Sequence, residues 1–235
     1  MINNFFLSRF GHIATIASRL ARKRAFALLG GLNKGLQPRE CYAIKKGYHH
    51  ATSAEAFDDT NNKDEWQKEV YQLALHCMRQ QDHRSVIDVG CGSAYKLVHM
   101  LGAYQTTGIE VNPTYNWLRQ TYPGKNWLLF DEVDPSSLQT DLVLCADVIE
   151  HIDDPDGLMQ FLQSIHCRQL LISTPERDAV AGKSDYGPPA NTSHYREWNA
   201  AEFREYVSRY FIVEEQIVLP GLSVTQVIIC RKKSH

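Results

Sequence analysis

The stretch Val86-Ile87-Asp88-Val89-Gly90-Cys91-Gly92 decides the fold of this chain. Its apolar residues predict a buried strand over Ser85 to Gly90, and a helix is expected directly afterwards, over Tyr95 to Leu101. Gly90 and Gly92 allow the backbone to turn tightly and to approach a ligand, because glycine has no Cβ atom. The segment therefore predicts a ligand site beyond the carboxyl end of a strand.

Strands and helices alternate along the rest of the chain. Further strands are expected at Thr107 to Val111, Trp127 to Phe130, Asp141 to Ala146, Gln169 to Ser173, Phe211 to Leu219 and Val224 to Cys230. Further helices are expected at Asp64 to Gln80, Pro113 to Thr121, Pro155 to Ile165 and Asn199 to Ser208, with Asp64 as the cap of the first. This alternation predicts an α/β fold with a doubly wound, mostly parallel sheet of seven strands. The last two strands have a short connection and should pair antiparallel at an edge.

The charge distribution divides the chain into two parts. Residues 1–39 contain seven Lys and Arg residues and no acid, although the whole chain has a net charge of -2. We therefore expect a basic N-terminal extension and connector over 1–62 and a domain over 63–235. Within 1–32, apolar residues at helical spacing predict a helix that packs on the domain or caps its pocket. Two alternatives are a basic helix on an anionic membrane surface and an organelle transit peptide.

Cysteine spacing and hydropathy exclude several classes of protein. The six cysteines form neither a CxxC pair nor a zinc-finger pattern, so we expect no metal site and a reducing compartment such as the cytoplasm. No segment approaches the ~18 consecutive apolar residues of a membrane span. The acidic domain has no basic face that would suit nucleic acid, so no nucleic-acid partner is expected.

Acidic side chains near the glycine turn indicate the kind of ligand. Glu110 ends the second expected strand, where a carboxylate can accept hydrogen bonds from both hydroxyls of a ribose. Asp88 lies inside the first strand and can orient the glycine turn or hold a cationic amino group. A dinucleotide fingerprint would have a third glycine at position 95, but Tyr95 stands there. The pattern favours a nucleoside-bearing cofactor without a pyrophosphate.

These segments resemble the class I S-adenosylmethionine-dependent methyltransferases. The resemblance rests on Val86 to Ser93, on Glu110 and on Asp141-Leu-Val-Leu-Cys-Ala-Asp-Val-Ile-Glu-His-Ile152. It implies S-adenosyl-L-methionine as the cofactor and a methyltransferase activity. The cofactor-binding residues that it implies are Asp88, Gly90, Cys91, Gly92, Glu110, Asp131 and Asp147, with Asp131 placed to meet the adenine amino group.

A narrower resemblance concerns the acceptor of the methyl group. Ser173 to Asp178 and His194 to Trp198 resemble the small-molecule and glycan-associated methyltransferases, including quinone-type O-methyltransferases. It implies O-methylation of a small-molecule, glycan or lipid-linked acceptor. Asp147, His151 and His194 are the candidate catalytic groups, because a carboxylate or an imidazole can accept a hydroxyl proton.

Arg196 and Glu197 are the candidate substrate-binding residues, since a guanidinium can bind a carboxylate or phosphate in a fork. Structural roles compete with these functional ones. His151 can belong to a turn that caps the next helix, and the residues from His194 to Glu197 can form a salt-bridged start to the helix at Asn199.

Two other functions remain open from the sequence. One is an NAD-type dinucleotide enzyme on a similar sheet. The other is a catalytically silent protein that binds S-adenosylmethionine as a regulatory or membrane-docked module. Tight NAD binding would favour the first, and cofactor binding without turnover would favour the second.

Overall fold

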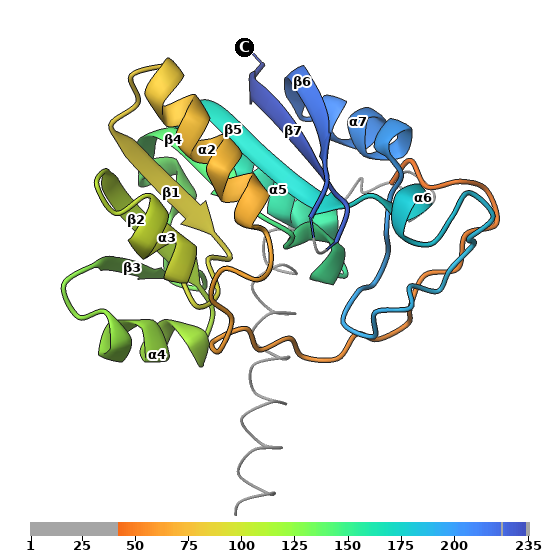
Figure 1. Cartoon of the computed structure of the whole chain (residues 1–235), viewed down its shortest axis with the longest axis horizontal. Coiled ribbons are helices and arrows are strands. Elements are labelled where there is room, and N and C mark those ends of the chain that lie inside the picture. The colour runs from red at the N-terminus through yellow and green to blue at the C-terminus, as the bar shows by residue number, and fades with distance from the viewer. Residues whose placement is uncertain (1–41, 222, 234–235) are drawn as a thin grey trace, which may run out of the picture.

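The computed structural model describes residues 42–221 and 223–233, so the helix expected within 1–32 lies outside the described part. Its centre is a seven-stranded sheet with the order β3-β2-β1-β4-β5-β7-β6 (Figure 1). The strands are β1 (Ser85–Val89), β2 (Gln105–Glu110), β3 (Asn126–Leu129), β4 (Gln139–Cys145), β5 (His166–Pro175), β6 (Phe211–Leu219) and β7 (Thr225–Lys232). Strands β1 to β5 pair in parallel, and β7 pairs antiparallel with both β5 and β6. The predicted α/β fold is confirmed, and the antiparallel strand β7 lies one place inside the edge strand β6.

Helices cover both faces of this sheet. They are α2 (Lys68–Gln80), α3 (Tyr95–Met100), α4 (Thr114–Thr121), α5 (Pro155–Ser164), α6 (Arg177–Val180) and α7 (Ala200–Ser208). Buried side chains of α2, α3 and α4 form one hydrophobic cluster with the sheet, whereas those of α5 and α7 form a second cluster on the opposite face. The sheet is therefore doubly wound, as the alternation of elements predicts.

Strand β1 contributes to both clusters because successive side chains of a strand point to opposite faces. Ile87 and Val89 belong to the cluster with α5 and α7, while Val86 belongs to the cluster with α2 and α3. Asp88 has the same parity as Val86 and meets Tyr71 of α2. The alternation of side chains along β1 thus places the ionisable side chain of Asp88 in the interior, directly below the turn that follows β1.

Two helix predictions need correction. Helix α2 begins at Lys68, not at Asp64, because Gln67 before it has a left-handed backbone with φ of 59°. Asp64 forms an exposed ion pair with Lys68 at 2.8 Å and does not cap the helix. The short helix α6 was not expected, and its first turn is capped by Glu176, which accepts a hydrogen bond from the Ala179 amide.

Two segments far apart in sequence lie side by side beyond the carboxyl ends of the strands (Figure 1). We call residues 42–67 and 181–198 the cover. Backbone hydrogen bonds join the two segments, from His49 N to Tyr186 O at 2.8 Å and from Ala51 N to Tyr195 O at 3.0 Å. The described part of the predicted connector therefore packs against the domain. No helix in residues 42–221 and 223–233 is long and apolar enough to cross a membrane.

Candidate active site

The turn after β1 has the open backbone that its glycines predict. Gly90 and Gly92 have positive φ angles of 76° and 55°. A Cβ atom at Gly90 would lie 2.6 Å from Val148 Cγ2, and one at Gly92 would overlap the carboxylate of Asp59. The site therefore requires glycine at both positions, for space as well as for backbone conformation.

Glu110 lies at the end of β2, beside this turn. Its carboxylate accepts hydrogen bonds from the Gly92 amide at 3.3 Å and from the Val111 amide at 2.6 Å. Gly90 and Glu110 both line a cavity, which we call the inner cavity, between the carboxyl ends of β1, β2 and β4. The structure thus brings together the glycine turn and the carboxylate that the sequence assigns to a nucleoside.

Four of the predicted cofactor residues, Asp88, Cys91, Gly92 and Asp131, line neither cavity described in this section. Cys91 is buried in the cluster below α2 and α3, so only its backbone is available at the turn. Asp131 is exposed, whereas Phe130 before it lines the inner cavity. Asp88 is completely buried, and the Tyr71 hydroxyl donates a hydrogen bond to it at 2.6 Å. These positions favour the orienting role for Asp88 over direct contact with a ligand.

Burial gives Asp88 an unusual titration. Loss of solvent raises the pKa of Asp88 from 3.8 to about 7, although the hydrogen bond from Tyr71 acts in the opposite direction. Between these pH values the unfolded chain releases a proton that the folded chain keeps, so this group makes folding less favourable as the pH rises. We expect Asp88→Asn to gain stability relative to wild type from about pH 4 to about pH 7, with no further change above, because asparagine does not titrate.

Urea unfolding of both proteins at a series of pH values would measure this difference. The exposed Asp82, whose side chain is 80% accessible, provides the matched control variant Asp82→Asn. A stability difference between Asp88→Asn and wild type that stays constant over this pH range would contradict the assignment.

Asp147 follows β4 and connects the inner cavity to a second space. Its backbone has a positive φ of 51°, and its carboxylate accepts a hydrogen bond from the Ser173 hydroxyl at 2.5 Å. Burial raises the pKa of Asp147 to about 6, which the contact with Ser173 partly offsets. The carboxylate is thus fixed by its neighbour on β5 and faces the ligand space.

The second space, which we call the outer cavity, has a volume of about 740 Å³. It is lined mainly by the cover, which includes His194 and Glu197, together with Glu150 and His151. The inner and outer cavities share the residues Phe57, Gln67, Asp147 and His151. They therefore adjoin at these side chains, and a ligand in one can reach a ligand in the other.

Comparison with known proteins identifies the chemistry of this pair of cavities. The family model described as a methyltransferase domain matches residues 59–215, which include the glycine turn, Glu110 and most residues that line the two cavities. The chain belongs to this methyltransferase family. The match decides against the dinucleotide enzyme considered above, and none of the curated proteins matches the sequence of this methyltransferase.

Solved structures share the fold of the methyltransferase at low identity. The methyltransferase domain of bacterial CtHen1 is 18% identical, with 72% of this chain and 99% of that chain covered and a TM-score of 0.56. The magnesium protoporphyrin IX methyltransferase of Synechocystis, solved with S-adenosylhomocysteine, is 14% identical over 92% of this chain and 95% of that chain, with a TM-score of 0.55. The 1,6-didemethyltoxoflavin-N1-methyltransferase of Burkholderia thailandensis is 20% identical, with 73% of this chain and 80% of that chain covered and a TM-score of 0.53.

The cofactor of this enzyme is S-adenosylmethionine, and the residues of the inner cavity fit it. Gly90 brings the backbone to the cavity wall without a side chain, and the Glu110 carboxylate lines the same cavity. Val89, Ile109 and Phe130 add the apolar walls that an adenine ring requires. When bound, the cofactor supplies an electrophilic methyl group.

The cover contributes residues to this site that sequence reasoning missed. Phe57, Asp59 and Gln67 line the inner cavity, and the first two belong to a segment that has no periodic pattern. It is held against the glycine turn because Ser93 Oγ donates to Asn62 O at 2.6 Å, and Lys96 Nζ donates to Lys63 O at 3.0 Å. The irregular spacing of residues in this segment predicts neither a helix nor a strand. Only their contacts in the folded chain show that they belong to the site.

His151 and His194 lie together at the outer cavity. Their ring centroids are 4.7 Å apart, and His151 also stacks on Phe57 at 5.0 Å. Glu150, beside His151, is completely buried and accepts a hydrogen bond from the Thr174 hydroxyl at 3.0 Å. Burial raises the pKa of the Glu150 carboxyl well above its usual range. The structure therefore brings both predicted histidines to one place and adds a carboxyl group there.

Arg196 does not have the position that a substrate-binding residue requires. Its guanidinium is completely buried and donates to Ile152 O at 2.7 Å and to Asp153 O at 2.6 Å. The prediction that Arg196 binds the substrate is therefore wrong. Arg196 stabilises the turn after β4 and lines neither cavity. Glu197 does line the outer cavity, but its carboxylate is hydrogen-bonded to His194 Nδ1 at 2.7 Å.

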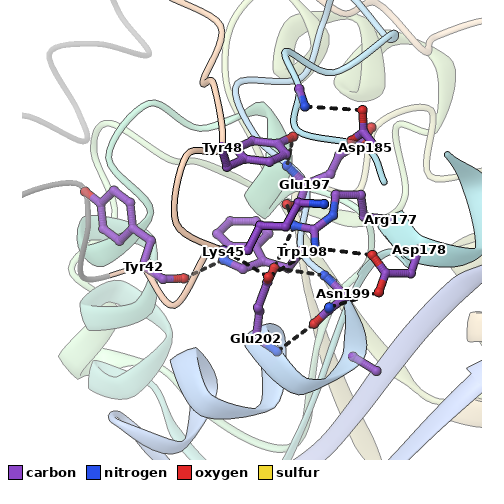
Figure 2. Close-up of polar contacts among 12 residues, drawn as sticks. Tyr42, Lys45, Tyr48, Arg177, Asp178, Asp185, Glu197, Trp198, Asn199 and Glu202 are labelled. Carbon is purple, nitrogen blue, oxygen red and sulfur yellow. Dashed lines mark hydrogen bonds and ion pairs between the residues drawn. The ribbon is translucent and has the colours of Figure 1, made fainter. Parts of the chain in front are cut away.

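A network of polar contacts that includes Tyr48, Arg177 and Glu202 surrounds Glu197 (Figure 2). The Glu197 amide donates to the Tyr48 hydroxyl at 3.2 Å, and the buried guanidinium of Arg177 donates to Glu197 O at 3.3 Å. Arg177 also forms an ion pair with Glu202 at 2.7 Å. Contacts from α6 and the cover thus hold Glu197 at the wall of the site, and α7 holds Arg177 through Glu202.

Proposed function

We propose that this enzyme transfers the methyl group of S-adenosylmethionine to a hydroxyl oxygen of a small-molecule, glycan or lipid-linked acceptor. One observation carries the proposal: the inner and outer cavities share Asp147 and His151. A cofactor in the inner cavity and an acceptor in the outer cavity would meet at these side chains. The outer volume of about 740 Å³ is in the usual range of ~300–1,000 Å³ for small-molecule sites.

The polar groups at this junction support a hydroxyl acceptor. In the transfer, a bond forms between the acceptor oxygen and the methyl carbon, the carbon–sulfur bond breaks, and the hydroxyl proton has to leave. The Asp147 carboxylate can take that proton, since it lines both cavities and Ser173 holds it in place. Much of the remaining catalysis comes from holding the two reactants in an attack geometry, which the cover favours by enclosing them.

An acceptor screen tests the proposed reaction. The full chain would be incubated with methyl-labelled S-adenosylmethionine and with matched phenols, sugar alcohols, polyprenyl-linked hydroxyls and amines, and the products analysed by mass spectrometry. We expect methyl ethers from one of the hydroxyl classes. Methylamine products would contradict the assignment to oxygen, and calorimetric cofactor binding without any transfer would favour the silent module instead.

Asp147→Asn tests the role of the carboxylate in proton removal. We expect kcat to fall by about 10²–10⁴-fold, the usual contribution of a positioned base, while thermal stability changes little. Steady-state kinetics on the best hydroxyl acceptor would measure the effect. Glu132→Gln, at an exposed acid after β3, is the matched control, and an Asp147→Asn enzyme with wild-type kcat would exclude the carboxylate as the base.

A further inference from the structure

We propose that Glu150, His151 and His194 form a binding site for a divalent first-row transition-metal ion at the outer cavity. Each of these residues offers one ligand atom, and the three atoms lie within 4.8 Å of one another. All three side chains line the outer cavity. The set combines two imidazoles with one carboxylate, and neither histidine belongs to a local sequence pattern for metals.

Hydrogen bonds place each histidine in the tautomer that a metal needs. His151 Nδ1 lies 3.0 Å from the carbonyl oxygen of Ser193. A carbonyl oxygen only accepts, so Nδ1 carries the proton and Nε2 carries the lone pair. Metal-binding histidines characteristically donate their second ring N–H to a carbonyl or a carboxylate in this way.

His194 has the same arrangement with a carboxylate partner. Its Nδ1 lies 2.7 Å from Glu197 Oε1, while Nε2 lies 3.0 Å from the side-chain amide nitrogen of Asn191. The Asn191 amide oxygen accepts from the Ser193 amide and hydroxyl, which directs its NH₂ group toward the ring. Nε2 of His194 is therefore an acceptor, and an ion would replace the Asn191 amide there.

Glu150 provides an independent indication of a cation site. Its side chain is 0% exposed, and Oε2 accepts from Thr174, but Oε1 has no hydrogen-bond partner. A buried carboxylate oxygen without a partner is costly, and a bound cation would satisfy it. Glu150 thus contributes a ligand that the fold itself leaves unsatisfied.

The donor set selects the class of ion. Two imidazoles and a carboxylate suit Mn²⁺, Fe²⁺, Co²⁺ or Zn²⁺, whereas Mg²⁺ and Ca²⁺ favour sites made of oxygen alone. Ligands at about 2.1 Å from an ion lie about 3 Å apart at right angles, so the three side chains would move inward slightly on binding. Further coordination positions would face the outer cavity. If the proposed O-methylation is correct, an acceptor oxygen bound there would lose its proton more readily.

Metal titration of the full chain tests the site without cofactor or acceptor. After removal of any affinity tag and treatment with chelator, Co²⁺ would be added and its visible absorption recorded, with Mn²⁺ binding followed by electron paramagnetic resonance. We expect one equivalent to bind, and His151→Ala and His194→Ala to weaken binding by at least about 100-fold. Glu197→Gln, which changes only the partner of His194, should weaken binding by about 10–100-fold. His166→Ala, at an exposed histidine of β5, is the matched control.

Two results would overturn the proposal. One is no saturable binding of either ion by the folded wild-type chain, and the other is binding that His151→Ala and His194→Ala leave unchanged. Circular dichroism of each variant would show that loss of binding does not reflect unfolding, and the exposed edge of His151 makes that variant the safer one. The titration contains no acceptor, so absence of metal binding would not contradict the proposed methyl transfer. In the same way, failure of the methyl-transfer assay would not contradict the metal site.

Discussion

Glu110→Ala should lose at least about 100-fold in affinity for S-adenosylmethionine while keeping its fold. The Glu110 carboxylate lines the inner cavity at the end of β2, where it can accept hydrogen bonds from ribose hydroxyls. Hydrogen bonds to a charged group contribute about 1.5–3 kcal/mol each, and 1.4 kcal/mol corresponds to a tenfold change in affinity. The variant also removes the acceptor of the Gly92 amide, so the glycine turn loses a support.

Calorimetry with S-adenosylhomocysteine as well as S-adenosylmethionine would measure this loss, because both share the ribose. Glu132→Ala is the matched control, since this exposed acid follows β3 at the same end of the sheet. Glu110→Gln keeps the shape and one oxygen acceptor, and it should fall between wild type and Glu110→Ala. Unchanged binding by a folded Glu110→Ala protein would remove this residue from the cofactor site.

Arg177→Met should lower the free energy of unfolding by about 3–5 kcal/mol, the usual cost of breaking a buried ion pair from one side. The Arg177 side chain is 0% exposed and meets both carboxylate oxygens of Glu202, at 2.7 Å and 3.1 Å. Glu202 also belongs to the capping box of α7 with Asn199 (Figure 2). Removal of the guanidinium leaves a nearly buried carboxylate without its cation and weakens the start of the helix.

Differential scanning calorimetry would show this as a fall in Tm of about 6–20 °C, given about 2–4 °C per kcal/mol for a chain of this size. Arg209→Met is the matched control, because the ion pair of Arg209 with Glu205 is exposed and an exposed pair contributes at most about 1 kcal/mol. Equal melting temperatures for the two variants would mean that the Arg177 network does not stabilise the domain. Arg177 also donates a hydrogen bond to the backbone of Glu197, the partner of His194. Weaker metal binding by Arg177→Met would therefore show that Arg177 helps to position the proposed metal site.

The residues of the cover show where sequence reasoning stops. Phe57 and Asp59 line the inner cavity, yet they belong to a segment that the sequence presents only as a polar connector. Contacts with distant segments hold this part of the chain in place, such as the hydrogen bonds from Ala51 N to Tyr195 O and from Ser93 Oγ to Asn62 O. Contacts between distant segments have no local period, so no pattern in either segment predicts them.

Arg196 and Asp88 show the same limit for single side chains. Both are polar residues in motifs that point to ligands, and each proves to be fully buried. Arg196 binds the carbonyl oxygens of residues 152 and 153, while Asp88 accepts from Tyr71 of the preceding helix. Residue type gives the possible partners of a side chain, but it does not decide whether a ligand or the protein itself provides them.

By itself the sequence determined the doubly wound sheet, the glycine turn and Glu110 beside it, because strand alternation, turn conformation and strand ends are local properties. Only the tertiary structure decided that Asp147 lines both cavities and that Glu150, His151 and His194 lie close together. It also decided that Arg196 is buried and binds backbone carbonyl oxygens. The physical reason is distance along the chain. Hydrogen bonds and cavities join residues from separate loops, whose meeting depends on how the whole sheet and its cover pack together.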